Sequence, residues 1–313
     1  MSPERQRDAA WLDALPGVLR DEPLARHSQF GVGGPADWFL KVSDADELAR
    51  LLRRCAEGGV PLTMLGAGSN ALILDGGVRG LVVRYDDRRL RVIDDTTVEL
   101  GGGCMLPRVA LDCARRGIAG LEFGIGVPGT CGARVYGNAG AFGTEIRDVI
   151  VDCDVLDPHG ERHSLDAAGC GFAYRRSRLV DELAGHVVVA ARFRVHPDEP
   201  AAVRARTDAI TAQRKAAQPW GTRSLGSVFK NPPADAAGRL IEAAGLKGAR
   251  QGGAQIAEKH ANFILNLSRA TAADVLALAE RAHDTVLQRF GVDLEREIVV
   301  LGEPRASTAL VSA

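Results

Sequence analysis

The stretch spanning residues 124–143 has the composition of a loop that binds an anion through its backbone. It reads GIGVPGTCGARVYGNAGAFG, with seven glycines and Arg134 as its single charged residue. Glycine adopts positive φ angles and lets another molecule approach the backbone closely. Successive N–H groups in such a loop form a concave site whose usual ligand is a phosphate. The stretch therefore predicts a cradle for a pyrophosphate, and the alternative is a run of tight turns between short strands.

A second glycine loop, GAGSN at residues 66–70, follows an apolar strand predicted at residues 62–65. Gly66, Gly68 and Ala71 fit the G-x-G-x-x-A pattern of a dinucleotide-binding turn, which must lead into a helix. Here residues 71–74 suit a strand instead, and they run directly into the DGG sequence at residues 75–77. The sequence therefore predicts strand, loop and strand, with a loop that can still bind phosphate.

Three polar segments lie far apart in the chain: YRRS at residues 174–177, GSVFKNP at 226–232 and LERE at 294–297. Taken singly, an arginine or glutamate in a loop is typical of a solvated charge. A serine beside glycine is typical of a turn. Only their combination with the glycine loops gives them a functional interpretation.

Composition excludes several classes of protein. The 313 residues are 46% hydrophobic and 25% charged, as in a soluble globular protein of one or two compact units. The net charge of −1 gives no basic field for nucleic acid or an acidic membrane. The six cysteines form no CxxC pair and no zinc-like spacing, so we expect reduced thiols and no metal. No signal peptide or membrane-spanning run is evident, which predicts a cytoplasmic protein.

Hydrophobic periodicity and turn signals predict alternating helices and short strands. A capping box is predicted at Ser43 and Asp46, and a second cap at Thr271 and Asp274. The Pro-rich, charged segment at residues 196–200 is the best candidate for a domain boundary. Helices are predicted at residues 47–57, 106–116, 201–218, 236–244 and 272–290. Strands are predicted at residues 37–42, 62–65, 71–74, 80–85, 91–94, 97–100, 149–156, 186–195, 261–265 and 294–301.

Seven ordered motifs together resemble the UDP-N-acetylenolpyruvoylglucosamine reductase family, flavoenzymes of peptidoglycan precursor synthesis. The resemblance covers roughly residues 27–302. The motifs are FGVGGPAD (30–37), LGAGSN (65–70), GVPGT with YGNAGAFG (126–143), YRRS (174–177), GSVFKNP (226–232), AEKHANFILN (257–266) and LEREI (294–298).

The resemblance implies an α+β fold, with a two-lobed FAD-binding domain of the PCMH/VAO type followed by a C-terminal α+β substrate-binding domain. The expected boundaries are a lead-in at residues 1–26, the FAD-binding domain at 27–198 with lobes at 27–85 and 86–198, the C-terminal domain at 199–304 and a tail at 305–313. The boundary at 198/199 agrees with the Pro-rich segment.

The implied reaction reduces the enolpyruvyl ether of UDP-N-acetylglucosamine to UDP-N-acetylmuramate, with NADPH supplying the hydride through non-covalent FAD. Arg175 matches the family's catalytic arginine, whose planar guanidinium suits the substrate carboxylate. Ser227 matches the proton donor. Glu297 matches the third catalytic residue, and Glu295 is the competing choice because residues two apart on a strand share a face.

The same motif matches imply two sets of binding residues. FAD-binding positions are Gly66, Ala67, Gly68, Ser69, Asn70, Gly126, Val127, Pro128, Gly129, Thr130, Gly132, Asn138 and Gly140. Substrate-binding positions are Tyr174, Lys230, Asn231 and His260, although a lone histidine is more often structural. The implied partner is a UDP-sugar, with no nucleic acid and no membrane, and the expected state is a monomer or weak oligomer.

Some positions depart from the family pattern and leave alternatives open. Arg134 and Ala257 stand where small residues and serine, respectively, are frequent, and residues 220–223 and Leu225 also differ. Another FAD oxidoreductase or oxidase of the same superfamily is one alternative, with Cys131 as a possible covalent attachment point. A flavin-binding module without catalysis is another, which the joint presence of Arg175, Ser227 and Glu297 disfavours.

Overall fold

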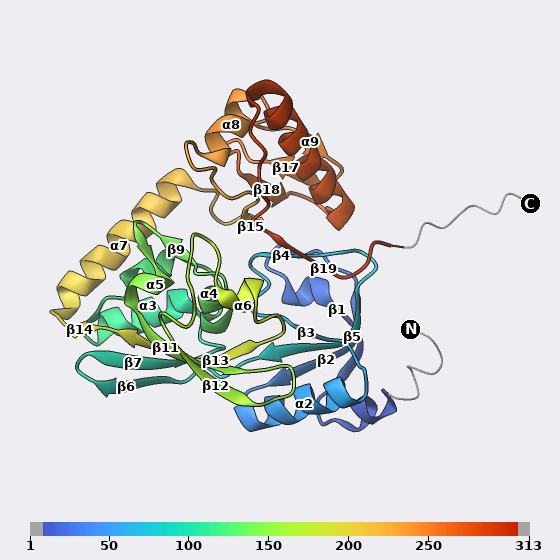
Figure 1. The fold of residues 1–313 in the computed structure, drawn as a ribbon. Helices are drawn as coiled ribbons and strands as arrows, with labels where there is room; N and C mark the ends of the chain where they lie inside the picture. The colour runs from blue at the N-terminus through green and yellow to red at the C-terminus, as the bar shows by residue number, and fades with distance from the viewer. Residues whose placement is uncertain (1–8, 306–313) are drawn as a thin grey trace, which may run out of the picture. The chain divides into compact units, whose positions relative to one another are not determined.

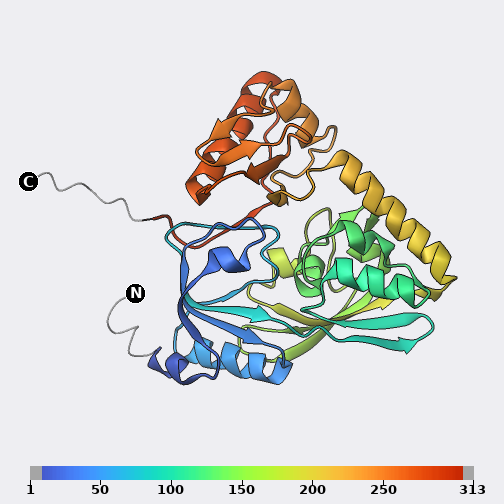
Figure 2. The same ribbon diagram turned by 180° about the vertical axis from the view of Figure 1, so that it is seen from behind.

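The structure, a computed structural model, describes residues 9–305. They form two compact units, each a mixture of helices and strands, which confirms the predicted α+β fold (Figures 1 and 2). The first unit contains residues 9–18, 40–67 and 83–218, and the second contains residues 19–39, 68–82 and 219–305. Among residues 9–305, no helix has both the length and the apolar character needed to cross a membrane.

A five-stranded antiparallel sheet forms the centre of the first unit (Figure 1). Its inward-facing side chains alternate along the strands, so that Val98, Leu100, Cys153, Val155 and Phe193 are all buried. Helices α3 (Leu106–Arg115) and α4 (Cys131–Tyr136) contribute apolar side chains to the same core. The strand order is β12 (Arg162–Asp166), β11 (Ile150–Leu156), β13 (Val187–Arg194), β7 (Thr97–Gly101) and β6 (Leu90–Asp94).

The long helix α7 (Pro200–Ala217) belongs to the first unit. It packs against α3 and the 3-10 helix η3 (Glu122–Gly126), where Val203 is buried beside Ala114 and Ala119. Because of this packing the first compact unit continues to Gln218, past the boundary proposed at residues 198/199.

Another sheet has the order β1 (Leu19–Pro23), β2 (Pro35–Val42), β5 (Val78–Tyr85) and β3 (Leu62–Met64). Strand β1 lies in the segment expected to be a lead-in, at residues 1–26. Four of its five residues are exposed, so it has no apolar alternation that could have predicted a strand. The next helix, α2 (Ala45–Glu57), buries Leu48, Leu51, Leu52 and Cys55 as predicted. The capping box predicted at Ser43 and Asp46 is wrong. Extended Asp44 is the N-cap and accepts a 2.8 Å hydrogen bond from Glu47 N.

The second unit contains a sheet of order β15 (Arg223–Ser227), β18 (Phe263–Asn266), β17 (Ala254–Ile256) and β16 (Arg250–Gln251). Helices α8 (Ala237–Ala243) and α9 (Ala272–Phe290) share its core, where Phe229, Leu240, Val275 and Leu278 are buried. The strand predicted at residues 294–301 is shorter than expected. Only β19 (Val299–Leu301) is a regular strand, and it pairs in parallel with β4 (Ala71–Ile73).

Shorter elements complete the described chain. They are η1 (Ala10–Ala14), η2 (Leu24–His27), β8 (Ile118–Ala119), β9 (Gly140–Ala141), β10 (Thr144–Glu145), α5 (Ile146–Val149), α6 (Arg178–Asp181) and β14 (His196–Pro197).

The predicted cap of α9 is confirmed. Thr271 Oγ1 accepts from Asp274 N at 3.1 Å, and Asp274 Oδ2 accepts from Thr271 N at 2.9 Å. We expect Thr271→Ala to lower the free energy of unfolding by about 1 kcal/mol, because the first turn of α9 loses its capping acceptor. Thr285→Ala is the matched control in the same helix, since its hydroxyl only donates back to Arg281 O. Urea unfolding of both variants measures the difference, and equal stabilities would contradict this role of Thr271.

Candidate functional site

The two glycine loops approach each other within the first unit. A methyl group added to Gly66 would lie 2.7 Å from Thr130 Oγ1, and Thr130 itself is buried. Gly66 therefore lies against the Thr130 side chain, and any larger residue at position 66 would collide with it.

Backbone hydrogen bonds fix the loop at residues 126–132. Leu106 N donates to Gly129 O at 3.1 Å, Cys131 N to Cys104 O at 2.7 Å and Gly132 N to Gly102 O at 2.9 Å. The 124–143 stretch contains the end of η3, a loop, α4 and β9, so it is more than a run of tight turns between short strands. Its segments thus have defined positions, as a preformed binding loop requires.

Gly129 has the strictest requirement for glycine in this loop. Its φ is +133°, and a Cβ there would lie 2.3 Å from Arg134 Nε. The guanidinium of Arg134, the residue that departs from the family pattern, therefore packs directly over Gly129. This places a cation beside the loop predicted to bind the pyrophosphate.

Cys131 is unsuited to covalent attachment of a cofactor. Its side chain is fully buried, and that burial raises the pKa of the thiol well above its ordinary value. A protonated, inaccessible thiol is a poor nucleophile. The geometry therefore favours a non-covalent cofactor.

Arg175 lies in a tight turn between Ala173 and Arg176, whose backbones exchange hydrogen bonds of 3.0 and 3.1 Å. Tyr174 is exposed at the tip, and the Arg175 guanidinium lies 5.1 Å from the centroid of its ring. Arg175 Nη2 donates to Gly140 O at 3.1 Å. Three predicted positions, Tyr174, Arg175 and Gly140, are therefore brought together.

Asn138 is fully buried, and its side chain is occupied by protein partners. Its Nδ2 donates to Ala173 O at 2.8 Å and to Glu145 Oε2 at 3.0 Å, while its Oδ1 accepts from Arg147 N at 3.1 Å. These hydrogen bonds make Asn138 a connection between three segments, and its assignment as an FAD-binding position stays a prediction.

Within the second unit, Asn70 joins the first glycine loop to the segment that carries Glu297. Asn70 Nδ2 donates to Glu297 O and Val299 N donates to Asn70 O, both at 2.9 Å. Gly68 has φ +60° and lies against the backbone of His27, while Ser69 is buried. Asn70 therefore determines the position of the segment around Glu297.

Ser227 and Glu297 lie on two segments that pair with each other. Glu297 N donates to Val228 O at 2.8 Å, and Phe229 pairs with Arg296. Asn262, to which the sequence motifs gave no role, is buried and holds the serine loop. Its Oδ1 accepts from Phe229 N at 2.9 Å, and its Nδ2 donates to Phe229 O at 2.8 Å. An asparagine within the apolar HANFIL segment was the available signal.

The contacts of Lys230 distinguish the two candidate glutamates, Glu295 and Glu297. Its Nζ lies 2.7 Å from Glu295 Oε1, and its backbone N donates to Glu295 O at 2.8 Å. Glu295 is therefore the ion-pair partner of Lys230, which favours Glu297 as the catalytic carboxylate. Asn231 Oδ1 accepts from Ala237 N at 3.1 Å, at the start of α8.

His260 occupies a structural position in the second unit. Its Nδ1 accepts from Asn262 N at 3.3 Å, and its ring lies edge-on to Phe263 at 4.9 Å. A methyl group on Gly238 would lie 2.9 Å from His260 Cε1. Burial lowers the pKa of His260, so the neutral form is favoured.

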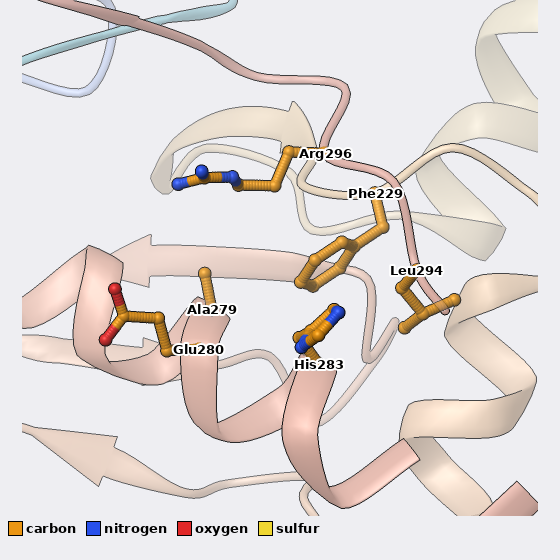
Figure 3. A pocket seen from close by; sticks show the side chains of 6 residues that line it. All are labelled: Phe229, Ala279, Glu280, His283, Leu294 and Arg296. Atoms are coloured by element: carbon orange, nitrogen blue, oxygen red, sulfur yellow. The ribbon is translucent and has the colours of Figure 1, made fainter. Parts of the chain in front are cut away.

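A cavity of about 280 Å³ lies between α9 and the segment preceding Glu297. Figure 3 shows the side chains of Phe229, Leu294 and Arg296 facing those of Ala279, Glu280 and His283 from α9. No residue predicted from the sequence as catalytic or ligand-binding lines it. Within residues 9–305, no group of three or more histidine, cysteine, aspartate or glutamate side chains has the arrangement of a metal site.

Comparison with known protein families assigns the class. A family model described as an FAD-binding domain matches residues 36–166, and the fold with its two glycine loops accordingly defines an FAD-binding flavoprotein. A model described as the C-terminal domain of UDP-N-acetylenolpyruvoylglucosamine reductase matches residues 218–301. The chain belongs to the UDP-N-acetylenolpyruvoylglucosamine reductase family, as its motifs predicted.

Individual relatives support this assignment over nearly the whole chain. The reductase 2 of Symbiobacterium thermophilum is 46% identical, over 96% of this chain and 98% of its own. The reductase of Moorella thermoacetica is 45% identical, over 91% and 94%. The crystal structure of the Thermus caldophilus reductase has a TM-score of 0.78 and 34% identity, and covers 91% of this chain and 98% of its own.

The described residues fit FAD on structural grounds as well. A side chain at Gly66 would collide with Thr130 and one at Gly129 with Arg134, so the two loops meet these residues through bare backbone, and Arg134 supplies a positive charge beside Gly129.

Gly129→Ala should weaken FAD binding at least tenfold, because alanine at a φ of +133° strains the loop and displaces Arg134. Titration of the deflavinated protein with FAD, followed by quenching of flavin fluorescence, measures the affinity. Gly137→Ala is the matched control, since the nearest atom to its Cβ lies at 3.9 Å. Equal affinities of the two variants would contradict the predicted cradle.

The neutral state of His260 predicts a pH dependence of stability. Because burial lowers its folded pKa below the unfolded value, its contribution is present above about pH 6.5 and is lost as the pH falls. His260→Gln should therefore lose less stability than the wild type between about pH 7.5 and 5.5.

His283 provides a comparison of opposite sign. Its hydrogen bonds to Asp284 and Asp293 raise its pKa, so its contribution is present below about pH 6.5 and is lost as the pH rises. His283→Gln should lose more stability than the wild type on acidification. Urea unfolding at both pH values tests the pair, and changes of the same sign would contradict the assignments.

Proposed function

We propose that this protein reduces UDP-N-acetylglucosamine enolpyruvate to UDP-N-acetylmuramate, with NADPH as the reductant and non-covalent FAD as the cofactor. The observation that carries the proposal is the pairing of the Ser227 loop with the Glu297 segment through Glu297 N and Val228 O. This pairing gives two motif residues, separated by 70 positions in sequence, defined positions on adjacent segments. Membership of the reductase family supports the substrate and the reductant.

The residues that would hold the cofactor are those of the two glycine loops, 66–70 and 126–132, together with Arg134. When bound, FAD supplies hydride transfer from NADPH to the terminal alkene carbon of the substrate. The chain itself supplies binding, orientation and charge stabilisation.

Arg175 binds the carboxylate of the enolpyruvyl group. Hydride addition to the terminal carbon leaves negative charge on the adjacent carbon and on that carboxylate, as an enolate. A guanidinium already in position stabilises this charge without reorganising in the transition state. Its planar fork matches both carboxylate oxygens.

Ser227 donates a proton to the enolate carbon, which completes the reduction. A serine hydroxyl is a weak acid, so it can protonate only a strongly basic centre such as this one. Glu297, held beside the serine loop by the bond to Val228 O, serves the enolic oxygens or a proton relay. Glu295 does not take this role because it pairs with Lys230.

Lys230 and Asn231 bind the UDP part of the substrate. The Lys230 ammonium can exchange Glu295 for the diphosphate, because Glu295 is largely exposed and gains hydration when released. Tyr174 offers an exposed ring for substrate contact, whereas His260 acts through packing. We further propose a cytoplasmic monomer or weak oligomer without nucleic-acid or membrane partners.

Anaerobic absorbance of the purified protein tests the proposal. NADPH should bleach the flavin bands, and UDP-N-acetylglucosamine enolpyruvate should then restore them without oxygen. Recovery only on admission of oxygen would indicate an oxidase-like relative with another substrate. Failure to bind any flavin would refute both the cofactor and the reaction.

Arg175→Ala should slow flavin reoxidation by the substrate by about a hundredfold or more, since the enolate loses its principal cation. Flavin content and reduction by NADPH should stay close to wild type, which rapid mixing measures separately. Arg176→Ala is the matched control, because the neighbouring arginine pairs with Asp181. Simultaneous loss of FAD in Arg175→Ala would assign Arg175 a structural role instead.

A further inference from the structure

We infer that Glu145 is a positioning residue for Arg175, and that Asn138 couples the two. This inference rests on the proposed function, because it gives Arg175 its role in binding the substrate carboxylate. Glu145 carries no role in the motif analysis, and it precedes Arg175 by 30 positions. Asn138, Glu145 and Arg175 all lie in the first unit.

The backbone of Arg175 is strained. It has a φ of +55° at the third position of the four-residue turn from Ala173 to Arg176. Glycine is the ordinary residue at a left-handed position of this kind, and a long side chain there has a cost. A strained arginine persists only where surrounding contacts determine the conformation, and the strain is consistent with a functional role for its side chain.

One carbonyl, of Gly140, and one carboxylate, of Glu145, lie beside the Arg175 guanidinium. Arg175 Nη2 donates to Gly140 O at 3.1 Å, and Nη1 lies 3.9 Å from Glu145 Oε1. The side chains of Arg175 and Glu145 are only 22% and 18% exposed, so solvent competes weakly for them. The partners occupy part of the guanidinium and restrict its rotation, as a bidentate contact with a substrate carboxylate requires.

Asn138 connects this carboxylate to the strained turn itself. Asn138 Nδ2 donates to Glu145 Oε2 at 3.0 Å and to Ala173 O at 2.8 Å. Since Ala173 begins the turn, Asn138 fixes the backbone of Arg175 relative to the carboxylate that faces its side chain. The amide is fully buried, so these bonds have no competing water at the surface.

Glu145 keeps its position through further contacts. Arg147 Nε lies 2.9 Å from Glu145 Oε2, and the Glu145 side chain forms a capping box at the start of α5 with Asp148. Glu145 thus faces two arginines and a helix start. Its charge offsets part of the positive charge of Arg175, so its benefit to the reaction is one of geometry rather than of added charge.

Glu145→Gln tests the inference, because it removes the charge while retaining the size of the side chain. Rapid mixing should show NADPH reducing the flavin within about twofold of wild type. Reoxidation by UDP-N-acetylglucosamine enolpyruvate should slow by about tenfold to a hundredfold, as expected for a misplaced catalytic group. Asp148→Asn is the matched control, since it disturbs the same capping box without touching Arg175.

A double variant separates positioning from a general structural effect. If Glu145 acts through Arg175, adding Glu145→Gln to Arg175→Ala should slow reoxidation no further than Arg175→Ala alone. A further loss, or an equal loss in Asp148→Asn, would overturn the inference. If Glu145→Gln fails to fold, Glu145→Asp replaces it, because aspartate is a strong N-cap but is one methylene too short to reach Arg175.

The same measurements distinguish a failure of the proposed function from a failure of the positioning role of Glu145. Wild-type protein whose reduced flavin is not reoxidised by the enolpyruvyl substrate would refute the proposed function. Wild-type reoxidation by that substrate, with an unchanged rate in Glu145→Gln, would refute only the positioning role.

Discussion

The pairing of β19, the last strand among residues 9–305, with the strand after the first glycine loop is the constraint on which the second unit depends. Strand β19 pairs in parallel with β4, and Asn70 bonds Glu297 O across 227 positions of sequence. The same returning segment bonds the serine loop through Val228 O. One short segment therefore connects a predicted cofactor loop to a predicted catalytic loop. Such a distant pairing has a loop-closure cost, which the buried core around Phe229 and Ile298 helps to offset.

In the first unit, the buried amide of Asn138 stabilises a turn that is unfavourable by itself. The turn at Arg175 is unfavourable by itself, because a non-glycine residue takes a left-handed conformation there. Asn138 and Ser177 each hold part of it: Asn138 Nδ2 donates to Ala173 O, and Ser177 Oγ donates to Tyr136 O at 2.6 Å. Strain at the arginine is thus offset by bonds around it, and the side chain is left in one orientation.

Local signals predicted much of the fold. The apolar face of α2 and the cap of α9 follow from residue spacing within a single helix, so both could be predicted from the sequence. Strand β1 could not be predicted because its residues are mostly exposed, and it is a strand only through its antiparallel pairing with β2. The roles of Glu145 and Asn262 could not be predicted for a related reason. A polar residue shows no pattern in sequence when its partners lie on other segments, and only the folded chain identifies them.

The glycine-rich stretch shows why composition alone left two interpretations open. Its glycines are present for different reasons, so the stretch is neither wholly a phosphate loop nor wholly a series of turns. Gly132 is required because Val188 O lies 2.8 Å from where a Cβ would stand, which concerns packing of α4 on the sheet. Gly137 has no close neighbour, whereas Gly129 combines a positive φ with the guanidinium of Arg134 above it. Where other members of the family were expected to have a small residue, this chain places a cation against Gly129, the glycine of residues 126–132 that has a positive φ. The departure therefore concerns the part of the stretch predicted to bind an anion, and it strengthens the cradle interpretation because a partly buried guanidinium beside the loop favours a phosphate there.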